Sequence, residues 1–140
     1  MKILLPVDGS KYTRRMLSYI AAHEELLGAG HQYLMFTVVP KLSLRAASFV
    51  DRDTLEAYYQ EEADKVLRAP LAFAAKQGWA VRSLHAKGHA PEEIAKLAVK
   101  EKADLIIMGS HGHSALGSAV LGSVAQGVLA RCATPLLFIR

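Results

Sequence analysis

The chain contains one cysteine, Cys132, among its 140 residues, so no disulfide can form within it. Such cysteine poverty is typical of reducing compartments, and we expect a cytoplasmic protein. We expect the thiol itself to be buried and inert on the last helix. Apolar runs of the ~18 residues that a membrane span needs are also lacking, and residues 1–6 are too short for a signal peptide. The sequence therefore predicts no membrane partner.

Concentrated basic charge is missing too, although the net charge is +4. The Lys and Arg residues stand singly or beside acids, and Arg14-Arg15 is the only adjacent basic pair. A nucleic-acid-binding surface usually needs a basic helix or patch with interleaved aromatic residues. We therefore expect no nucleic-acid partner, only a mildly basic surface that helps to recruit a small anion.

Acidic residues are absent from one long stretch, because no Asp or Glu follows Asp104 in residues 105–140. A helix N-terminus carries about half a positive charge and normally attracts a carboxylate into its first turn. The helix expected near the end of the chain has residues 124–126 there, none of them acidic. This pattern favours an anion-binding helix N-terminus. The alternative is a capping box of Ser123 with Gln126, which would satisfy part of that N-terminus internally.

Apolar runs and amphipathic segments alternate along the chain, separated by Gly and Pro. Strands are expected at residues 3–7, Gln32–Val39, Ala80–Ala86, Leu105–Met108 and Leu136–Ile139, and helices at Lys11–Leu27, Arg52–Gln77, about Pro91–Lys102 and from Ser118 or Ser123 to Cys132, with a loop at Lys41–Val50. Pro70 should kink or split the second helix. Five such alternations without a linker predict a single domain over residues 1–140, an α/β doubly wound fold with a parallel sheet and helices on both faces.

The final expected strand, Leu136–Ile139, is too apolar to be left as an exposed sheet edge. Either another part of the chain covers it, or it pairs with the same strand of a second copy. We predict a two-fold homodimer through this strand.

Two loops carry the residues expected at a ligand site. In doubly wound sheets a ligand binds beyond the carboxyl ends of the strands, where the connections diverge to opposite faces. Asp8-Gly9-Ser10 follows the first strand, and the glycine-rich segment 109–123 follows the fourth. Glycines allow close approach of the backbone to a ligand, and a helix start offers free amides to phosphate. Asp8 would accept a hydrogen bond from a ribose hydroxyl. Alternatively, it would be the N-cap of the first helix.

At these residues the sequence resembles the universal stress protein family. The family signature is Gly, two residues, Gly, nine residues, Gly and then Ser or Thr, and it is met by Gly109, Gly112, Gly122 and Ser123. The resemblance extends from residues 3–8 to the last strand. It implies a five-stranded sheet ordered 3-2-1-4-5, which would bring the two loops together, and it implies the ATP-binding branch of the family. Members commonly dimerise through the last strand.

The resemblance also implies where an adenine nucleotide would lie. By position, the adenosine would be lined by Pro6, Val7 and Asp8, and the adenine would meet Val39. The nucleoside would also touch Met108 and Gly109. The phosphates would be held by Gly112, Gly122, Ser123 and Val124. Many relatives have an Arg or Lys in this loop, where this chain has His111 and His113. ATP would then be held by amides, the helix dipole, a divalent ion such as Mg²⁺, or protonated histidine. We expect no metal site at these histidines, since no Cys or carboxylate accompanies them.

The leading functional hypothesis is a regulatory, ATP-binding stress-response module that acts as a homodimer. The sequence has no Walker A motif and no obvious general base in the glycine loop. We therefore assign no catalytic residue and expect at most weak ATP hydrolysis, with His111 or His113 as a weak base. Two alternatives are an enzyme of nucleotide hydrolysis or transfer, and a dimerisation scaffold whose glycine loop is empty.

Overall fold

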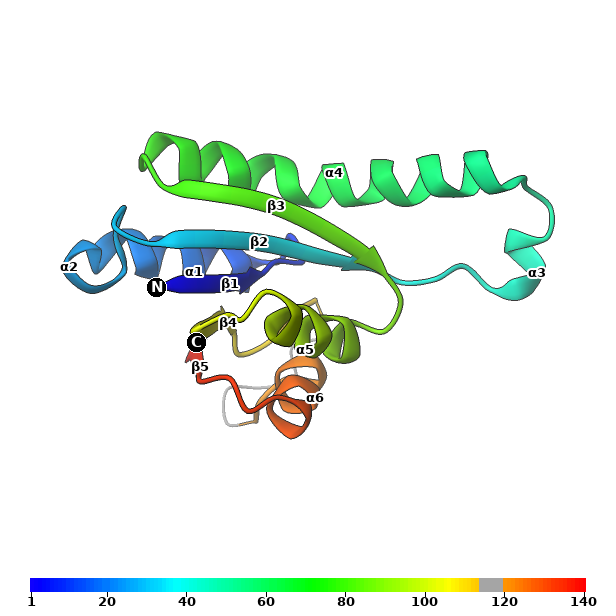
Figure 1. Cartoon of the computed structure of the whole chain (residues 1–140). Helices are drawn as coiled ribbons and strands as arrows, with labels where there is room; N and C mark the ends of the chain where they lie inside the picture. Colours follow the sequence, from blue (N-terminus) through cyan, green and yellow to red (C-terminus); the bar gives the residue numbers. More distant parts are fainter. Residues whose placement is uncertain (114–119) are drawn as a thin grey trace.

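A computed structural model describes residues 1–113 and 120–140 (Figure 1). Its elements, in chain order, are β1 (Lys2–Pro6), α1 (Lys11–Ala22), α2 (Glu24–Leu27), β2 (Gln32–Val39), α3 (Leu44–Ala47), α4 (Arg52–Lys76), β3 (Ala80–Lys87), α5 (Ala90–Lys100), β4 (Leu105–Gly109), α6 (Ser123–Arg131) and β5 (Leu136–Ile139). The described strands form one five-stranded parallel sheet in the order β3-β2-β1-β4-β5. The predicted fold class and strand order are confirmed.

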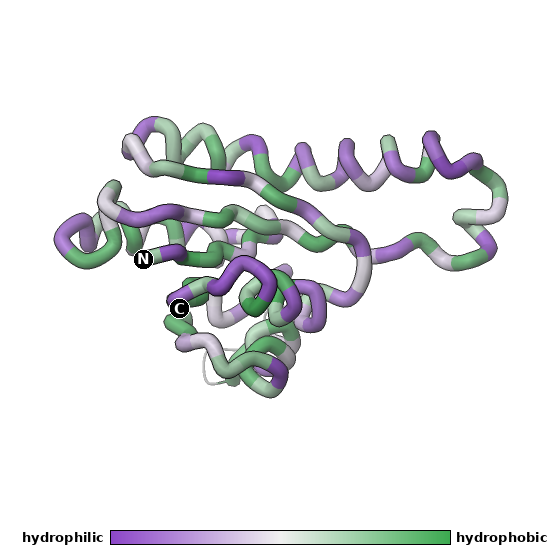
Figure 2. Tube along the Cα trace, viewed as in Figure 1, coloured by the Kyte–Doolittle hydropathy of each residue, from purple (hydrophilic) through white to green (hydrophobic). Residues whose placement is uncertain are grey.

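Helices cover both faces of the sheet, and each face has its own apolar cluster. On one face, α1 and α4 pack over Ile3, Leu5 and Ile107; on the other, α5 and α6 pack over Leu4 and Ile106. Figure 1 shows α4 on one side of the sheet, with α5 and α6 on the other. Successive residues of a strand point to opposite faces, so a strand buried on both sides reads as an unbroken apolar run. The tube coloured by hydropathy shows the hydrophobic residues concentrated along these strands (Figure 2).

Two expected segments have different boundaries in the structure. The helix expected at Lys11–Leu27 is two helices, because His23 adopts φ −116° and ψ 49° and interrupts the helix after Ala22. The loop expected at Lys41–Val50 contains the short helix α3, whose first turn is capped by the Ser43 side chain at Ala46 N. Both differences arise from local side-chain and backbone bonding that apolar periodicity does not report.

Of the two outcomes predicted at Pro70, a kink or a split, the split is wrong, because α4 runs as one helix from Arg52 to Lys76. Proline removes the hydrogen bond of its own amide and crowds the preceding turn. In this helix Pro70 is buried, together with Tyr59, Ala63 and Leu67 of the same helix. Packing of this stripe on the sheet holds the helix together across the missing bond. The start predicted for the last helix at Ser118 lies outside the described residues; the alternative start, Ser123, is the first residue of α6.

The strand order places the functional region. β1 and β4 are neighbours, yet the chain leaves β1 toward α1 on one face and leaves β4 toward α6 on the other. Their carboxyl ends therefore border the crevice at which doubly wound proteins bind ligands. No helix in the described part of the chain has the length and apolar character that crossing a bilayer requires.

Candidate functional site

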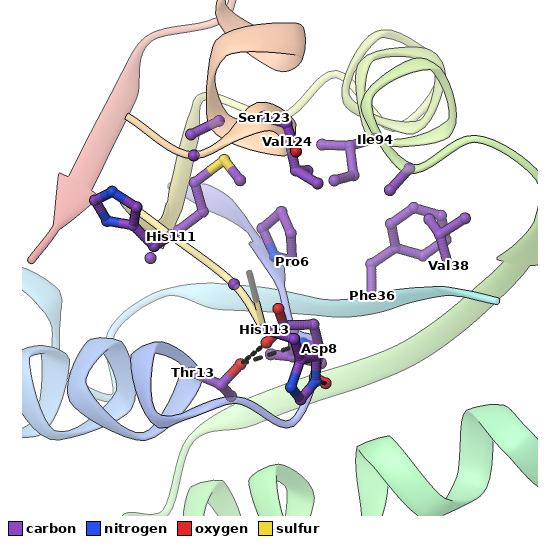
Figure 3. Close-up of a pocket in the computed structure, with 17 residues that line it drawn as sticks. Pro6, Asp8, Thr13, Phe36, Val38, Ile94, His111, His113, Ser123 and Val124 are labelled. Carbon is purple, nitrogen blue, oxygen red and sulfur yellow. Dashed lines mark hydrogen bonds between the residues drawn. The ribbon is translucent and has the colours of Figure 1, made fainter. Parts of the chain in front are cut away.

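A cavity of about 240 Å³ lies where β1 and β4 end (Figure 3). It is slightly smaller than the ~300–1,000 Å³ typical of small-molecule sites. The structure brings together at its wall all but one of the residues that the sequence nominated: Pro6, Val7, Asp8, Met108, Gly109, His111, Gly112, His113, Gly122, Ser123 and Val124. The two loops that lie about a hundred residues apart in the sequence thus form one site.

Val39 is the exception, since it does not line the cavity. Its side chain is buried in the apolar cluster on the α1 and α4 face of the sheet. The neighbouring residue of β2, Val38, lines the cavity instead, together with Phe36. Residues two apart in a strand share a face, so a shift of one position moves the contact to the wrong side of the sheet.

One end of the cavity is apolar. It is lined by Phe36 and Val38 of β2 and by Ala90 and Ile94 from the first turns of α5. Figure 3 shows Phe36, Val38 and Ile94 gathered on the side of the cavity away from His111. Sequence reasoning missed all four. The signal was available for two of them, because Ala90 and Ile94 have the i, i+4 spacing of one helical face. An apolar wall of this kind suits an aromatic ring system.

Asp8 is fixed in place by the start of α1. One carboxylate oxygen, Oδ1, accepts hydrogen bonds from Ser10 N at 2.9 Å and from the Thr13 hydroxyl at 3.0 Å. The Asp8 amide donates back to the Thr13 oxygen at 3.2 Å. The N-cap of α1 is Ser10, so the alternative that Asp8 caps this helix is wrong. The second oxygen, Oδ2, accepts no hydrogen bond from the described residues.

The glycine loop approaches Asp8 very closely. A Cβ added at Gly112 would lie 2.5 Å from Asp8 Oδ2, so this position accepts only glycine without a shift. The next residue extends the contact, because His113 Nε2 donates to the Asp8 carbonyl at 2.6 Å. The segment from His111 to His113 is thereby tied to the turn that follows β1.

The N-terminus of α6 points unbonded amides at the cavity. Gly122 is the N-cap, and the first intrahelical bond runs from Gln126 N to the Gly122 carbonyl at 3.0 Å. The amides of residues 123–125 therefore have no acceptor in the helix. Among the described residues, these amides have no other acceptor either, including the first two, Ser123 N and Val124 N. Two peptide donors and the positive end of the helix dipole are available to an anion.

Two expectations about this N-terminus are corrected. The capping-box alternative fails because Gly122, and not Ser123, is the N-cap of α6, and Gln126 Nε2 donates to the Leu121 carbonyl at 2.5 Å. The Gly122 amide, expected to hold phosphate, is already engaged, since it donates to the Ser110 carbonyl at 2.7 Å. Gly122 instead ties the end of the loop to the residue that follows β4, leaving the amides of Ser123 and Val124 as donors.

His111 contributes a buried, unpartnered nitrogen to the site. Its Nδ1 lies 3.0 Å from the hydroxyl of Ser110, a residue only 3% exposed, and its ring packs 5.3 Å from the Tyr12 ring. The other nitrogen, Nε2, is buried and has no hydrogen-bond partner in the described part of the chain. A buried polar atom without a partner is costly, so a ligand oxygen at this position would be stabilising.

These features define a doubly wound α/β protein with an anion-accepting cavity at its topological switch point. The whole chain, residues 1–140, matches the universal stress protein family. The chain belongs to this family.

Similar proteins cover nearly the entire chain. A universal stress protein of Thermus aquaticus, from the QAH/OAS sulfhydrylase 3′ region, is 31% identical over 138 residues, covering 99% of this chain and 97% of that one. The structure of the hypothetical protein MJ0577, from Methanocaldococcus jannaschii, superposes with a TM-score of 0.80 at 29% identity, covering 99% and 94% of the two chains. The universal stress protein of Archaeoglobus fulgidus in complex with dAMP has the same fold, with a TM-score of 0.70 at 20% identity over 100% and 98%.

Proposed function

We propose that the cavity binds an adenine nucleotide, ATP among them, and that the protein is a regulatory nucleotide-binding module of the stress response. The observation that carries the proposal is the pairing of two features in one cavity. One end is an apolar slot, and the other presents the unbonded amides of Ser123 and Val124 at a helix N-terminus. Asp8 is the only acidic side chain among the described residues of the wall, so an anion meets little repulsion there.

Each part of the nucleotide has matching chemistry in the wall. The purine would lie between Phe36, Val38 and Ile94. The ribose hydroxyls would donate to Asp8 Oδ2, whose position is set by the Ser10 and Thr13 bonds to Oδ1. The phosphates would accept from the α6 amides and from His111 Nε2. Mg²⁺ would be coordinated by phosphate oxygens and water, as it commonly is with nucleotides.

Family membership supports the proposal, as does the bound dAMP of the Archaeoglobus relative. The same comparison supports a role as a module that holds a nucleotide. The single cysteine supports a reducing compartment such as the cytoplasm as its location. The histidines of the glycine loop would allow at most slow hydrolysis, because His113 Nε2 already donates to the Asp8 carbonyl and His111 Nε2 would donate to phosphate.

The direct test is to ask what the purified protein carries. After exhaustive dialysis the protein is denatured, and the nucleotide content of the supernatant is measured by chromatography and mass spectrometry. We expect an adenine nucleotide in substoichiometric to stoichiometric amount. Release of ADP and phosphate from added ATP at a steady rate would favour the hydrolase alternative. A protein that carries no nucleotide and binds none on titration would contradict the proposal.

We further propose that two copies pair through β5. The strand is at the edge of the sheet, next to β4. Ile106 N donates to the Pro135 carbonyl and Ser110 N to the Ile139 carbonyl, so alternation directs the backbone groups of Leu136 and Phe138 away from β4. These outward groups and the apolar side chains of the strand support an isologous, strand-to-strand contact.

Phe138→Pro tests this pairing, because proline removes an outward amide. We expect the wild type to be dimeric and the variant monomeric in light scattering after size-exclusion chromatography. Phe138→Ala is the matched control, since it trims the same side chain but keeps the amide, and it should remain dimeric. A monomeric wild type, or two variants with the same mass, would contradict pairing through this backbone edge.

A further inference from the structure

A second hollow, of about 630 Å³, lies on the surface between α1 and the end of β5. Its wall contains four cationic side chains, Lys11, Arg14, Arg15 and Arg140. Ser18, Tyr19 and Ile139 complete it. All four cations are exposed. We refer to this hollow as the α1–β5 cleft.

The α1–β5 cleft joins two stretches of sequence that contain no carboxylate side chain. Residues 9–23 include all of α1, residues 105–140 include β5, and neither stretch has an Asp or Glu. Accordingly, no described residue forms an ion pair with any of the four cations. Elsewhere on the surface, lysines sit one helical turn from an acid, as in Lys65 with Glu62 and Lys96 with Glu93. The cleft therefore concentrates positive charge, with no Asp or Glu side chain of the described residues paired to it.

The stability of α1 does not explain these cations. Lys11 and Arg14 lie in the first turn, where the helix dipole disfavours positive charge. Lys11 also stands i, i+3 and i, i+4 from Arg14 and Arg15, spacings at which like charges repel. The Tyr12 ring offers limited compensation through Lys11 and Arg15, each 5.4 Å from its centroid. Such an arrangement is stabilised when an external anion binds.

We propose that the α1–β5 cleft docks an acidic segment of a partner protein, whose carboxylates pair with Lys11, Arg14 and Arg15. Positions 11, 14, 15, 18 and 19 form one stripe of α1, about 12 Å long at ~1.5 Å per residue. That length matches three or four residues of an extended segment at ~3.3 Å each. Guanidinium groups bind carboxylates through two parallel hydrogen bonds, which favours Asp and Glu side chains as the occupants.

The aromatic residues of α1 favour a protein segment over single-stranded nucleic acid. Binding of single strands relies on open aromatic faces on which bases stack. Tyr19 is already stacked on His23, with the ring centroids 4.0 Å apart, and Tyr12 packs against His111 at 5.3 Å. A second copy paired on β5 would not neutralise the cleft through its adjacent strand, because that strand comes from the same carboxylate-free stretch.

The test measures how tightly the full chain binds a fluorescein-labelled peptide of alternating Glu and Ser. Binding is monitored by fluorescence anisotropy, at low and at physiological salt. The double variant Arg14→Glu, Arg15→Glu should weaken binding by about tenfold or more, because attraction becomes repulsion. Arg68→Glu with Lys76→Glu is the matched control: it makes the same change in net charge at exposed positions of α4, outside the cleft, and should change affinity less than about twofold. A Gln and Ser peptide should not bind.

Thermal unfolding of each variant shows whether the fold is intact, and Arg14→Gln with Arg15→Gln replaces the charge reversal should that variant unfold. The measurement requires no nucleotide, so its outcome is separate from that of the proposed function. Equal losses in the two double variants would overturn the proposal, because they would indicate a response to net charge alone. Tighter binding of a labelled single-stranded oligonucleotide than of the acidic peptide would overturn it as well, as would no binding of the peptide to the wild type.

Discussion

Gly112→Val should lower the affinity for adenine nucleotides by about 10- to 100-fold while the protein stays folded. The added Cβ would lie 2.5 Å from Asp8 Oδ2. Asp8 cannot easily move aside, because its other oxygen is held by Ser10 N and the Thr13 hydroxyl. The glycine loop must therefore shift away from the turn after β1, which separates the ribose-facing carboxylate from the donors at the other wall. Isothermal titration calorimetry with ATP and AMP measures the loss.

Gly30→Val is the matched control for this substitution. Gly30 is exposed in the turn before β2, and a Cβ added there meets nothing within 4 Å. The same change in side chain should leave nucleotide affinity unaltered. If Gly112→Val binds ATP as tightly as the wild type, the close approach of the glycine loop to Asp8 has no part in binding, and the assignment of this cavity would be contradicted.

Ser123→Glu should move stability and binding in opposite directions. A carboxylate in the first turn of α6 interacts favourably with the helix dipole and should stabilise the fold by about 0.3–1 kcal/mol. The same carboxylate occupies the place proposed for phosphate and repels it. Affinity for ATP should fall by about 100-fold or more, because juxtaposed like charges cost several kcal/mol. Chemical denaturation and calorimetry on the same preparation measure both effects.

Ser123→Gln separates charge from size in this experiment. Its side chain has nearly the volume of Glu but carries no charge, so it should weaken ATP binding much less and give no dipole stabilisation. A glutamate variant that binds ATP normally would show that the phosphates lie elsewhere. A glutamate variant that loses stability would show that a negative charge at the N-terminus of α6 does not stabilise this helix.

Much of the fold follows from the sequence because each β-strand of the sheet centre is an apolar run between turn residues. Ile3, Leu4 and Leu5 are all fully buried, yet they face two different clusters, and only a sheet covered on both sides accommodates that pattern. The strand order came from the resemblance to a family, because periodicity specifies the strands but not their neighbours. The interruption at His23 and the continuity of α4 through Pro70 depend on local bonding and on tertiary packing.

The sequence predicted residues of the cavity correctly at positions that only one residue type can fill. The glycine spacing pointed to close backbone approach, and Gly112 has that role against Asp8. Face assignments were less secure, because one residue of register separates Val38 at the cavity from Val39 in the opposite cluster. The bond from the Gly122 amide to Ser110 joins the two ends of the glycine-rich segment, so local sequence could not reveal that this donor is already used.

The basic residues of the α1–β5 cleft could not be recognised as one patch from the sequence. Along the sequence the basic residues look scattered, with one adjacent pair at Arg14 and Arg15. The fold places Arg140 beside them, because α1 packs against β4 and β5. Helical spacing then adds Lys11 to the same stripe. Basic residues that are scattered along the sequence therefore form one concentrated patch on the folded protein.

The most direct measurement of the central claim is an amide NMR titration of ¹⁵N-labelled protein with ATP, with Ser123 and Val124 as the reporters. These two amides lack an acceptor among the described residues, whereas the neighbouring Gly122 amide is already bonded to Ser110. We predict that the Ser123 and Val124 resonances shift strongly downfield as phosphate accepts their hydrogens, and that Gly122 shifts less. ATP binding that leaves both resonances in place, while perturbing amides elsewhere, would contradict the account.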